Sequence, residues 1–166
     1  MISKENNQSL ALAEYYFRSN NYQLAEAILK TIIEIDFCNS KANELLAYIR
    51  SNQGNHELAH QLLSRACQEK DASANAFYYL GDSFLKKNQF REAKECFTAA
   101  LNKAGDFFEG LHDLATAHAN LGEKESALFW YQKALKIKND SHELLYNLGK
   151  IFDELKRLKT VSYTHL

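Results

Sequence analysis

The sequence contains no proline and only six glycines among its 166 residues. A multi-stranded β protein needs many tight turns, which these two residues favour, so their scarcity argues against that class. Lys and Arg number 20 and Asp and Glu number 21, so the chain lacks the basic excess on which general nucleic-acid binding depends. No run of apolar residues approaches the roughly 18 of a membrane span. The hydrophobic fraction of 46% instead favours a folded chain of long helices with short connections.

Cysteine is also scarce. Cys38, Cys67 and Cys96 are odd in number and lie 29 residues apart, a spacing that fits neither a disulfide framework nor a set of metal ligands. We expect reduced thiols in buried packing positions, as in a cytosolic protein. No apolar stretch long enough for a signal peptide follows the N-terminus. The predicted location is therefore cytoplasmic, and no cofactor is expected.

A repeat of 34 residues runs through the chain without insertion or deletion. Alanine recurs at this interval, and so does leucine, each time followed by Ala or Gly. The two columns are Ala25, Ala59, Ala93 and Ala127, and Leu12, Leu46, Leu80, Leu114 and Leu148. Phe77, Leu80, Gly81 and Phe84 fall at i, i+3, i+4 and i+7, which is one face of a helix. Each unit therefore contains a first helix followed by a second.

Helix ends are also marked in the sequence. Asn20, Gly54, Asn88 and Gly122 form a column between the two helices of each unit, and these residue types tolerate the left-handed conformation that ends a helix. Two pairs have capping-box spacing and predict helix starts. The pairs are Asp106 with Glu109 and Asp140 with Glu143.

The segments Phe77-Tyr-Tyr-Leu80-Gly81-Asp-Ser-Phe84 and Ala93-Lys-Glu-Cys-Phe97-Thr-Ala-Ala100 resemble the tetratricopeptide repeat (TPR), and the resemblance covers residues 6 to about 159. It implies an all-α, right-handed superhelical solenoid of antiparallel helix pairs. The sequence departs from the family at two columns. The opening aromatic is Ser9, Asn43, Phe77, Leu111 and Leu145, and the usual proline is replaced by Phe37, Asp71, Gly105 and Asn139.

The period predicts four repeats and a half repeat. They span 6–39, 40–73, 74–107, 108–141 and 142–159, with the first helix of the fifth at 142 to about 155. The terminal residues 160–166 then depart from the pattern, with Val161 in the alanine column. They resemble the translated mosaic end of a transposase adapter used in sequencing libraries. We interpret them as a remnant of sequence assembly, the alternative being an ordinary frayed tail.

The segment His56-Glu57-Leu58-Ala59-His60 matches the HExxH pattern of zinc peptidases. The repeat already accounts for it, because Ala59 belongs to the alanine column and no third ligand is evident. The other histidines considered, His112, His118 and His142, form no ligand cluster. No Gly-rich phosphate loop or nucleophile elbow is present. We therefore predict neither a metal site nor a catalytic constellation in this chain.

In the tetratricopeptide-repeat family, the first helix of each unit lines a concave groove, and the resemblance places tyrosines beside acidic residues there. This pattern suits a peptide that carries Lys or Arg and apolar anchors. The predicted groove residues are Glu14, Phe17, Arg18, Glu44, Tyr48, Tyr78, Tyr79, Asp82, His112, Asp113, Tyr146, Asn147 and Lys150. The neighbouring inward positions are Leu10, Leu45, Ser51, Leu85, Thr116, Ala119 and Asp153. The acidic residues do not fit the clamp that some relatives use for chaperone tails.

Two functions remain open. The first is a non-catalytic interaction module, a scaffold or adaptor that binds a peptide or partner segment in the groove. The second is a substrate-recruiting arm at the N-terminal side of a larger enzyme such as an O-linked glycosyltransferase, which rests on analogy. Self-association through the uncapped last helix is a further expectation, because Leu145, Leu148, Ile151, Phe152 and Leu155 lack a second helix to cover them.

Overall fold

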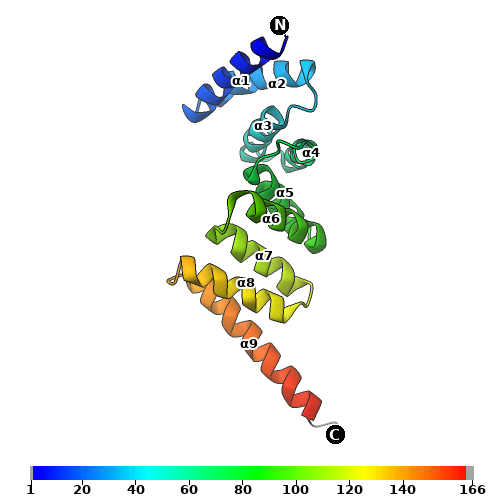
Figure 1. Cartoon of the computed structure of the whole chain (residues 1–166), viewed down its shortest axis with the longest axis vertical. Helices are drawn as coiled ribbons and strands as arrows, with labels where there is room; N and C mark the ends of the chain where they lie inside the picture. The colour runs from blue at the N-terminus through cyan, green and yellow to red at the C-terminus, as the bar shows by residue number, and fades with distance from the viewer. Residues whose placement is uncertain (1, 164–166) are drawn as a thin grey trace. The chain divides into compact units, whose positions relative to one another are not determined.

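The computed structural model describes the backbone of residues 2–163 and the side chains of residues 7–156. Within that part of the chain there are nine α-helices and no strand (Figure 1), which confirms the predicted all-α repeat fold. The helices are α1 (Ile2–Arg18), α2 (Tyr22–Ile35), α3 (Ser40–Asn52), α4 (His56–Ala66), α5 (Ala74–Lys86), α6 (Phe90–Ala104), α7 (Phe108–Asn120), α8 (Lys124–Ile137) and α9 (His142–Tyr163). They form two compact units, an N-terminal unit up to Ser83 and a C-terminal unit from Phe84.

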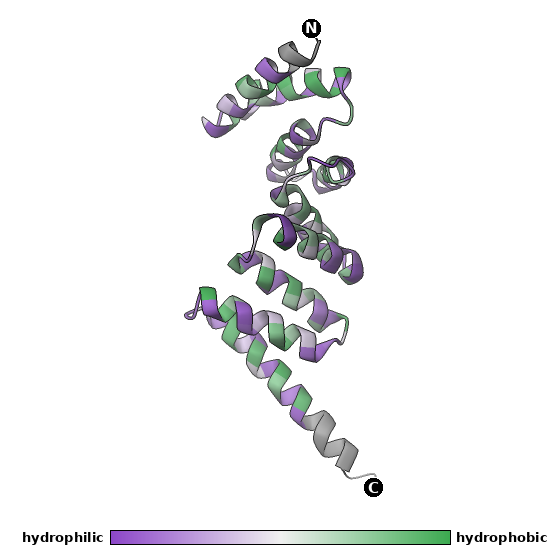
Figure 2. Cartoon of the chain, in the orientation of Figure 1, coloured by the Kyte–Doolittle hydropathy of each residue, from purple (hydrophilic) through white to green (hydrophobic). Residues whose placement is uncertain are grey.

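Each helix is amphipathic, with hydrophobic and hydrophilic positions alternating along it (Figure 2). In the N-terminal unit α1 packs on α2, α2 on α3 and α3 on α4; in the C-terminal unit α6 packs on α7, α7 on α8 and α8 on α9. The alanine column is buried throughout, since a methyl group leaves room for a neighbouring helix to approach. The leucine column is buried at its last four positions, whereas Leu12 is 47% exposed because no described helix covers that side of α1.

The left-handed helix ends lie where the sequence predicts them. The backbone φ is positive at all four residues of the column, at 57° for Asn20, 80° for Gly54, 58° for Asn88 and 78° for Gly122. At each of them the chain leaves one helix and begins a tight turn toward the next. Within the units these turns make the pairs α1–α2, α3–α4 and α7–α8 antiparallel.

The predicted capping boxes are wrong. α7 begins at Phe108 with Phe107 as its cap residue, which makes no side-chain capping bond, and Asp106 instead forms an ion pair with Lys133 of α8. At the start of α9 the Oγ of Ser141, not Asp140, accepts the N–H of Leu144. Capping-box spacing alone did not identify the residue that precedes the first turn, and these positions are shifted from the structure's helix starts by one or two residues.

The last helix is longer than the sequence predicted. α9 continues to Tyr163 instead of ending near 155, so the first part of the suspected assembly remnant is helical, while its final three residues lie outside the described part. Of the apolar stripe that the sequence leaves without a second covering helix, Leu148 and Ile151 are buried within the C-terminal unit. Leu145 and Phe152 remain exposed on the opposite side.

In the second repeat, Asn43 occupies the position at which the sequence resemblance leads one to expect an aromatic residue. The side chain is fully buried, and its amide Nδ2 donates to the carbonyl oxygens of Phe37 and Asn39, both at 2.9 Å. Its Oδ1 accepts from Arg65 of α4 at 3.3 Å, and the Arg65 guanidinium lies 3.5 Å from the centre of the Phe37 ring. The buried polar atoms are thus satisfied, so a polar group can occupy this core position.

A search of the described helices for a segment both long enough and apolar enough to cross a bilayer finds none.

Candidate functional site

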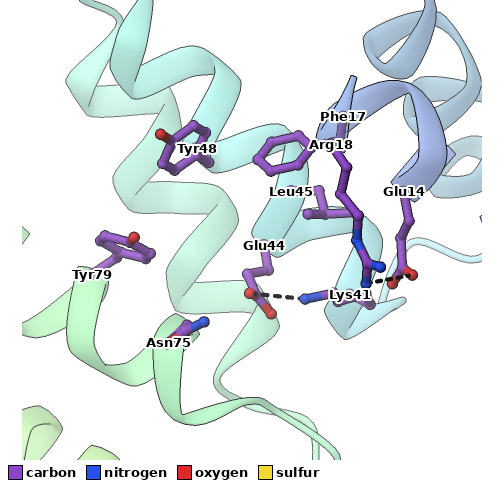
Figure 3. Close-up of a pocket in the computed structure, with 9 residues that line it drawn as sticks. All are labelled: Glu14, Phe17, Arg18, Lys41, Glu44, Leu45, Tyr48, Asn75 and Tyr79. Carbon is purple, nitrogen blue, oxygen red and sulfur yellow. Dashed lines mark hydrogen bonds and ion pairs between the residues drawn. The ribbon is translucent and has the colours of Figure 1, made fainter. Parts of the chain in front are cut away.

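The N-terminal unit contains a cavity of about 270 Å³ between the first helices of its repeats. Residues from α1, α3 and α5 line it, and we call it the aromatic pocket (Figure 3). Its lining residues are Glu14, Phe17, Arg18, Lys41, Glu44, Leu45, Tyr48, Asn75 and Tyr79. Six of these were predicted as groove residues from the sequence, and Leu45 as a neighbouring position. Lys41 and Asn75 were not predicted.

Aromatic rings form one part of the pocket. The Phe17 and Tyr48 ring centres are 5.2 Å apart and those of Tyr48 and Tyr79 are 6.1 Å apart, both in edge-to-face geometry. Three successive first helices thus contribute one ring each. Burial, together with Tyr48 and the carboxylates of Glu44 and Asp82, raises the pKa of the Tyr79 phenol, so its hydroxyl stays protonated and able to donate.

Charged groups gather on the other side of the pocket. Figure 3 shows Tyr48 and Tyr79 on its left and Arg18, Glu14 and Lys41 on its right. Arg18 lies 3.9 Å from Glu14, a loose pair within α1, and Lys41 lies 3.1 Å from Glu44 within α3. The pocket therefore contains two acidic and two basic side chains, and its charges balance.

Glu44 is the least accessible of these charged groups. Its side chain is 7% exposed; one carboxylate oxygen accepts from Lys41 and the other accepts from Ser73 Oγ at 2.8 Å. Ser73 precedes α5, and its Oγ also accepts the N–H of Ala76 at 3.0 Å, as a helix cap does. Glu44 consequently holds the start of α5, the helix that carries Asn75 and Tyr79 to the pocket.

Other predicted groove residues lie outside this pocket. Tyr78 and Asp82 are half-buried on α5, and the Tyr78 ring lies 5.5 Å from that of Tyr79, but neither residue lines the cavity. In the C-terminal unit His112 and Asp113 are half-buried, and Tyr146 on α9 is exposed. The structure thus brings together six of the predicted groove residues, from α1, α3 and α5, and leaves these five outside the aromatic pocket.

A second cavity, of about 160 Å³, lies in the C-terminal unit between α7, α8 and α9. It contains the predicted groove residues Asn147 and Lys150, and we call it the polar pocket. Its lining residues are Thr116, Ala119, Asn120, Lys124, Tyr131, Asn147, Lys150, Ile151 and Glu154. Lys124 and Glu154 form an ion pair of 2.9 Å across it.

A hydrogen-bonded chain of side chains lies beside the polar pocket. Asp113 contacts His112 Nδ1 at 2.9 Å, and Asn147 contacts His112 Nε2 at 3.5 Å. The Thr116 and Tyr131 hydroxyls are 2.9 Å apart, and burial raises the pKa of the Tyr131 phenol. His112 stacks on Phe108 at 6.0 Å. The polar atoms of these side chains therefore find partners within the C-terminal unit.

The zinc-peptidase pattern has a structural explanation. Asn55 caps α4 by accepting the N–H of Leu58, Ala59 is buried, and the His60 ring contacts Ser83 Oγ at 3.0 Å. In the part of the chain that the structure describes, no group of three or more His, Cys, Asp or Glu residues could hold a metal ion.

The cysteines differ from one another more than the sequence suggests. Cys38 is exposed, contrary to the expectation of burial, whereas Cys67 and Cys96 are partly buried. Burial, with Glu95 and Glu92 adding to it, raises the pKa of the Cys96 thiol to about 11. That thiol is therefore protonated at neutral pH and is a poor nucleophile.

The chain is similar to known proteins in part of its length by a family model and in most of its length by single relatives. Residues 78–143 match the family model described as tetratricopeptide repeat. Protein O-mannosyl-transferase TMTC1 of Homo sapiens is 26% identical over 156 residues, which are 92% of this chain and 18% of that protein. The chain thus spans less than a fifth of the length of this curated relative.

Solved structures show the same fold. YrrB, described as a TPR protein with an unusual peptide-binding site, superposes with a TM-score of 0.81 at 18% identity, over 89% of this chain and 76% of that chain. MamA superposes with a TM-score of 0.77 at 17% identity, over 98% of this chain and 90% of that chain. At these identities the likenesses show the fold alone.

Proposed function

Because the chain has the tetratricopeptide-repeat fold, we propose that it is a non-catalytic interaction module that binds a peptide or partner segment on its first helices. The observation that carries this proposal is the aromatic pocket, in which Phe17, Tyr48 and Tyr79 come from three successive first helices. Aromatic rings around a preformed cavity are typical of sites that bind an apolar side chain. YrrB, of the same fold, is described as having a peptide-binding site, which supports a peptide as ligand.

The rings contribute contact area at a low entropic cost. They contact one another edge to face, so their orientations are restricted before a ligand arrives. A preorganised site loses less side-chain entropy on binding, which leaves more of the contact energy for affinity. We therefore place the apolar anchor of the ligand in the cavity, against the exposed surfaces of the Tyr48 and Tyr79 rings.

A peptide library tests the proposal. The purified chain is screened against N-acetylated, C-amidated dodecapeptides with one apolar anchor, and the dissociation constant of the selected peptides is measured by fluorescence anisotropy. Truncating one aromatic wall at Tyr48→Ala is expected to weaken binding by about tenfold or more. Tyr79→Ala is also expected to weaken peptide binding, and because Tyr79 is more exposed than Tyr48 this substitution should disturb the fold less.

Tyr15→Ala is the matched control, since Tyr15 is an exposed tyrosine of the same unit that does not line the pocket. Circular dichroism of all three variants establishes that they remain helical. Equal affinity of the Tyr48→Ala and Tyr15→Ala variants for the selected peptides would contradict the proposed site.

The alternative function, a recruiting arm of a larger enzyme, receives less support. The match to an O-mannosyl-transferase covers only 18% of that protein, so its activity is not carried over to this chain. The sequence of the full-length gene discriminates between the two functions. Further repeats followed by a stop favour the interaction module, and a nucleotide-sugar-binding domain favours the enzyme.

A further inference from the structure

We propose that the aromatic pocket selects an acidic segment, in which an aspartate or glutamate side chain follows closely on the apolar anchor. This inference rests on the proposed function and names the partner class for the same site. Its charge is opposite to that expected from the sequence, which favoured Lys or Arg in the ligand. The expected charge of the ligand changes because the pocket leaves its cationic groups more accessible than its carboxylates.

The accessible charges of the pocket are its cations. The Arg18 side chain is 81% exposed and that of Lys41 is 38% exposed. The carboxylates are less accessible, with side chains 31% exposed at Glu14 and 7% exposed at Glu44. A ligand that enters the pocket therefore meets the guanidinium and ammonium groups first.

The carboxylates are also already engaged. Both oxygens of Glu44 accept hydrogen bonds, from Lys41 and from Ser73, so a basic ligand group would have to displace one of them. Lys41 uses one of its three ammonium donors for Glu44 and retains the others for a ligand.

Arg18 can change partner at little cost. Its pair with Glu14 has a separation of 3.9 Å and lies at the surface, and exposed pairs of this kind contribute little to stability. A guanidinium group also accepts a carboxylate in bidentate geometry, which the loose pair with Glu14 does not provide. A ligand carboxylate beside Arg18 would gain contacts that the free protein does not make.

The arrangement of the pocket fits an internal segment of a chain. Tyr48 and Tyr79 lie on one side of the pocket and Arg18 and Lys41 on the other (Figure 3), so neighbouring side chains of one extended peptide can reach both. Asn75, on the first turn of α5, also lines the cavity. Its amide has donors and acceptors suited to a peptide group of a backbone that continues beyond the pocket. We therefore commit to a side-chain carboxylate, not to the carboxylate of a chain terminus.

Four fluorescent peptides test this inference. Three are blocked Gly-Ser dodecapeptides that share a central Leu-Phe pair and carry Asp, Asn or Lys at the two positions that follow it. The fourth has the Asn sequence, shortened to end at these positions with a free C-terminal carboxylate. We expect the Asp peptide to bind about fivefold more tightly than the Asn peptide and the Lys peptide to bind most weakly. Added salt should reduce the difference.

Charge reversal identifies the residue responsible. Arg18→Glu is expected to remove the preference for Asp and to raise the affinity for the Lys peptide, and its exposure leaves the fold intact. Arg91→Glu is the matched control, since Arg91 is an exposed arginine on α6 outside the pocket and the change in net charge is the same. Equal effects of the two substitutions overturn the inference, and so does tighter binding of the Lys peptide to the unmodified chain.

The outcomes also separate this inference from the proposed function. Tightest binding of the fourth peptide would overturn the choice of a side-chain carboxylate. If the peptides bind with no preference for Asp and Tyr48→Ala weakens them all, the peptide site stands and the acidic preference is wrong. If none binds, both the proposed function and the inference are contradicted.

Discussion

Ser73 Oγ donates a hydrogen bond of 2.8 Å to the carboxylate of Glu44 and thereby joins the start of α5 to α3. The same oxygen accepts the N–H of Ala76, so one hydroxyl both caps a helix and ties it to its neighbour. Glu44, which lines the pocket, thus also helps to position the wall that carries Tyr79.

Ser73→Ala removes both bonds. We expect the free energy of unfolding to fall by about 1–2 kcal/mol, and the selected peptides to bind more weakly because α5 is no longer held in place. Ser73→Thr should restore both properties, since its hydroxyl can also cap. Urea denaturation and anisotropy measure the two effects, with Ser51→Ala on the exposed end of α3 as control. A Ser73→Ala variant as stable as Ser51→Ala would show that the bond contributes nothing.

Asn43 supplies a second stability test. Its buried amide makes three hydrogen bonds, to Phe37, Asn39 and Arg65. Asn43→Ala removes these hydrogen bonds and leaves the partner groups unsatisfied. We expect it to lower the free energy of unfolding by about 1–3 kcal/mol. Asn52→Ala, at an exposed position of the same helix, should change the stability little. Comparable urea midpoints for the two variants would mean that water replaces the lost bonds without cost.

How far the sequence predicts this structure depends on the range of each interaction. The repeat period identified the buried columns and the positive φ at Asn20 and Gly54, because these features depend on residues within one helical hairpin. The ion pair between Asp106 and Lys133 was missed because it joins residues distant in sequence. The local spacing from Asp106 to Glu109 alone therefore suggested a helix cap.

The candidate site was predicted in part. The aromatic residues of the pocket were predicted because the family resemblance places the first helix of each repeat on the groove. Phe17, Tyr48 and Tyr79 are not separated by the 34-residue period, so they do not occupy equivalent positions in their repeats. The availability of the charged groups did not follow. Whether Glu44 faces a ligand or is occupied by Lys41 and Ser73 depends on side-chain rotamers and on the path of α5. No periodicity encodes those features.

Acidification should weaken the C-terminal unit through Glu123. Hydrogen bonds from Lys94 of α6 and His118 of α7 hold the pKa of this carboxyl below its ordinary value of 4.5. A lowered folded-state pKa means that the stabilisation is present in full above about pH 4.5 and is lost as the pH falls through the lowered value. Glu123 precedes α8 and contacts both α6 and α7 through these two partners. Protonation of its carboxylate should therefore lower the stability of the whole C-terminal unit.

Urea midpoints at pH 7 and pH 3.5 measure this effect. The Glu123→Gln variant is expected to be less stable than the unmodified chain at pH 7 and to lose less stability on acidification. Glu125→Gln changes an exposed carboxyl in the first turn of α8 and serves as control. Identical pH dependence of the two variants would exclude Glu123 as a source of acid sensitivity.

We expect the HExxH segment at residues 56–60 not to bind zinc. The structure accounts for its residues by capping, packing and the contact of His60 with Ser83, and a zinc site needs three protein ligands in suitable geometry. Isothermal titration with zinc chloride should show no tight stoichiometric binding, and His60→Ala should leave the titration unchanged. Stoichiometric zinc binding that is lost in His60→Ala would refute this prediction.

One side of α9 packs on α8, and no described helix covers the opposite side. Leu144, Leu148 and Ile151 are buried, whereas Leu145 and Phe152 are 47% and 45% exposed. Leu111, one repeat before Leu145, is fully buried. Covering these two half-exposed side chains would contribute about 1.5–3 kcal/mol in total, which the described chain forgoes. Repeat arrays are stabilised by contacts between neighbours, so a helix covered on one side should open before the others.

We therefore predict that amide hydrogens of α9 exchange faster than those of α7, and that the exposed pair drives self-association. Hydrogen exchange followed by mass spectrometry compares the helices, and sedimentation velocity at increasing concentration detects association. Replacing both Leu145 and Phe152 by Glu should keep the chain monomeric, because two carboxylates at the contact would have to be desolvated. Leu24→Glu, which changes an equally exposed leucine of the N-terminal unit, should leave association unaffected. Protection of α9 equal to that of α7 in a strictly monomeric sample would show that contacts to this face are not needed for its stability.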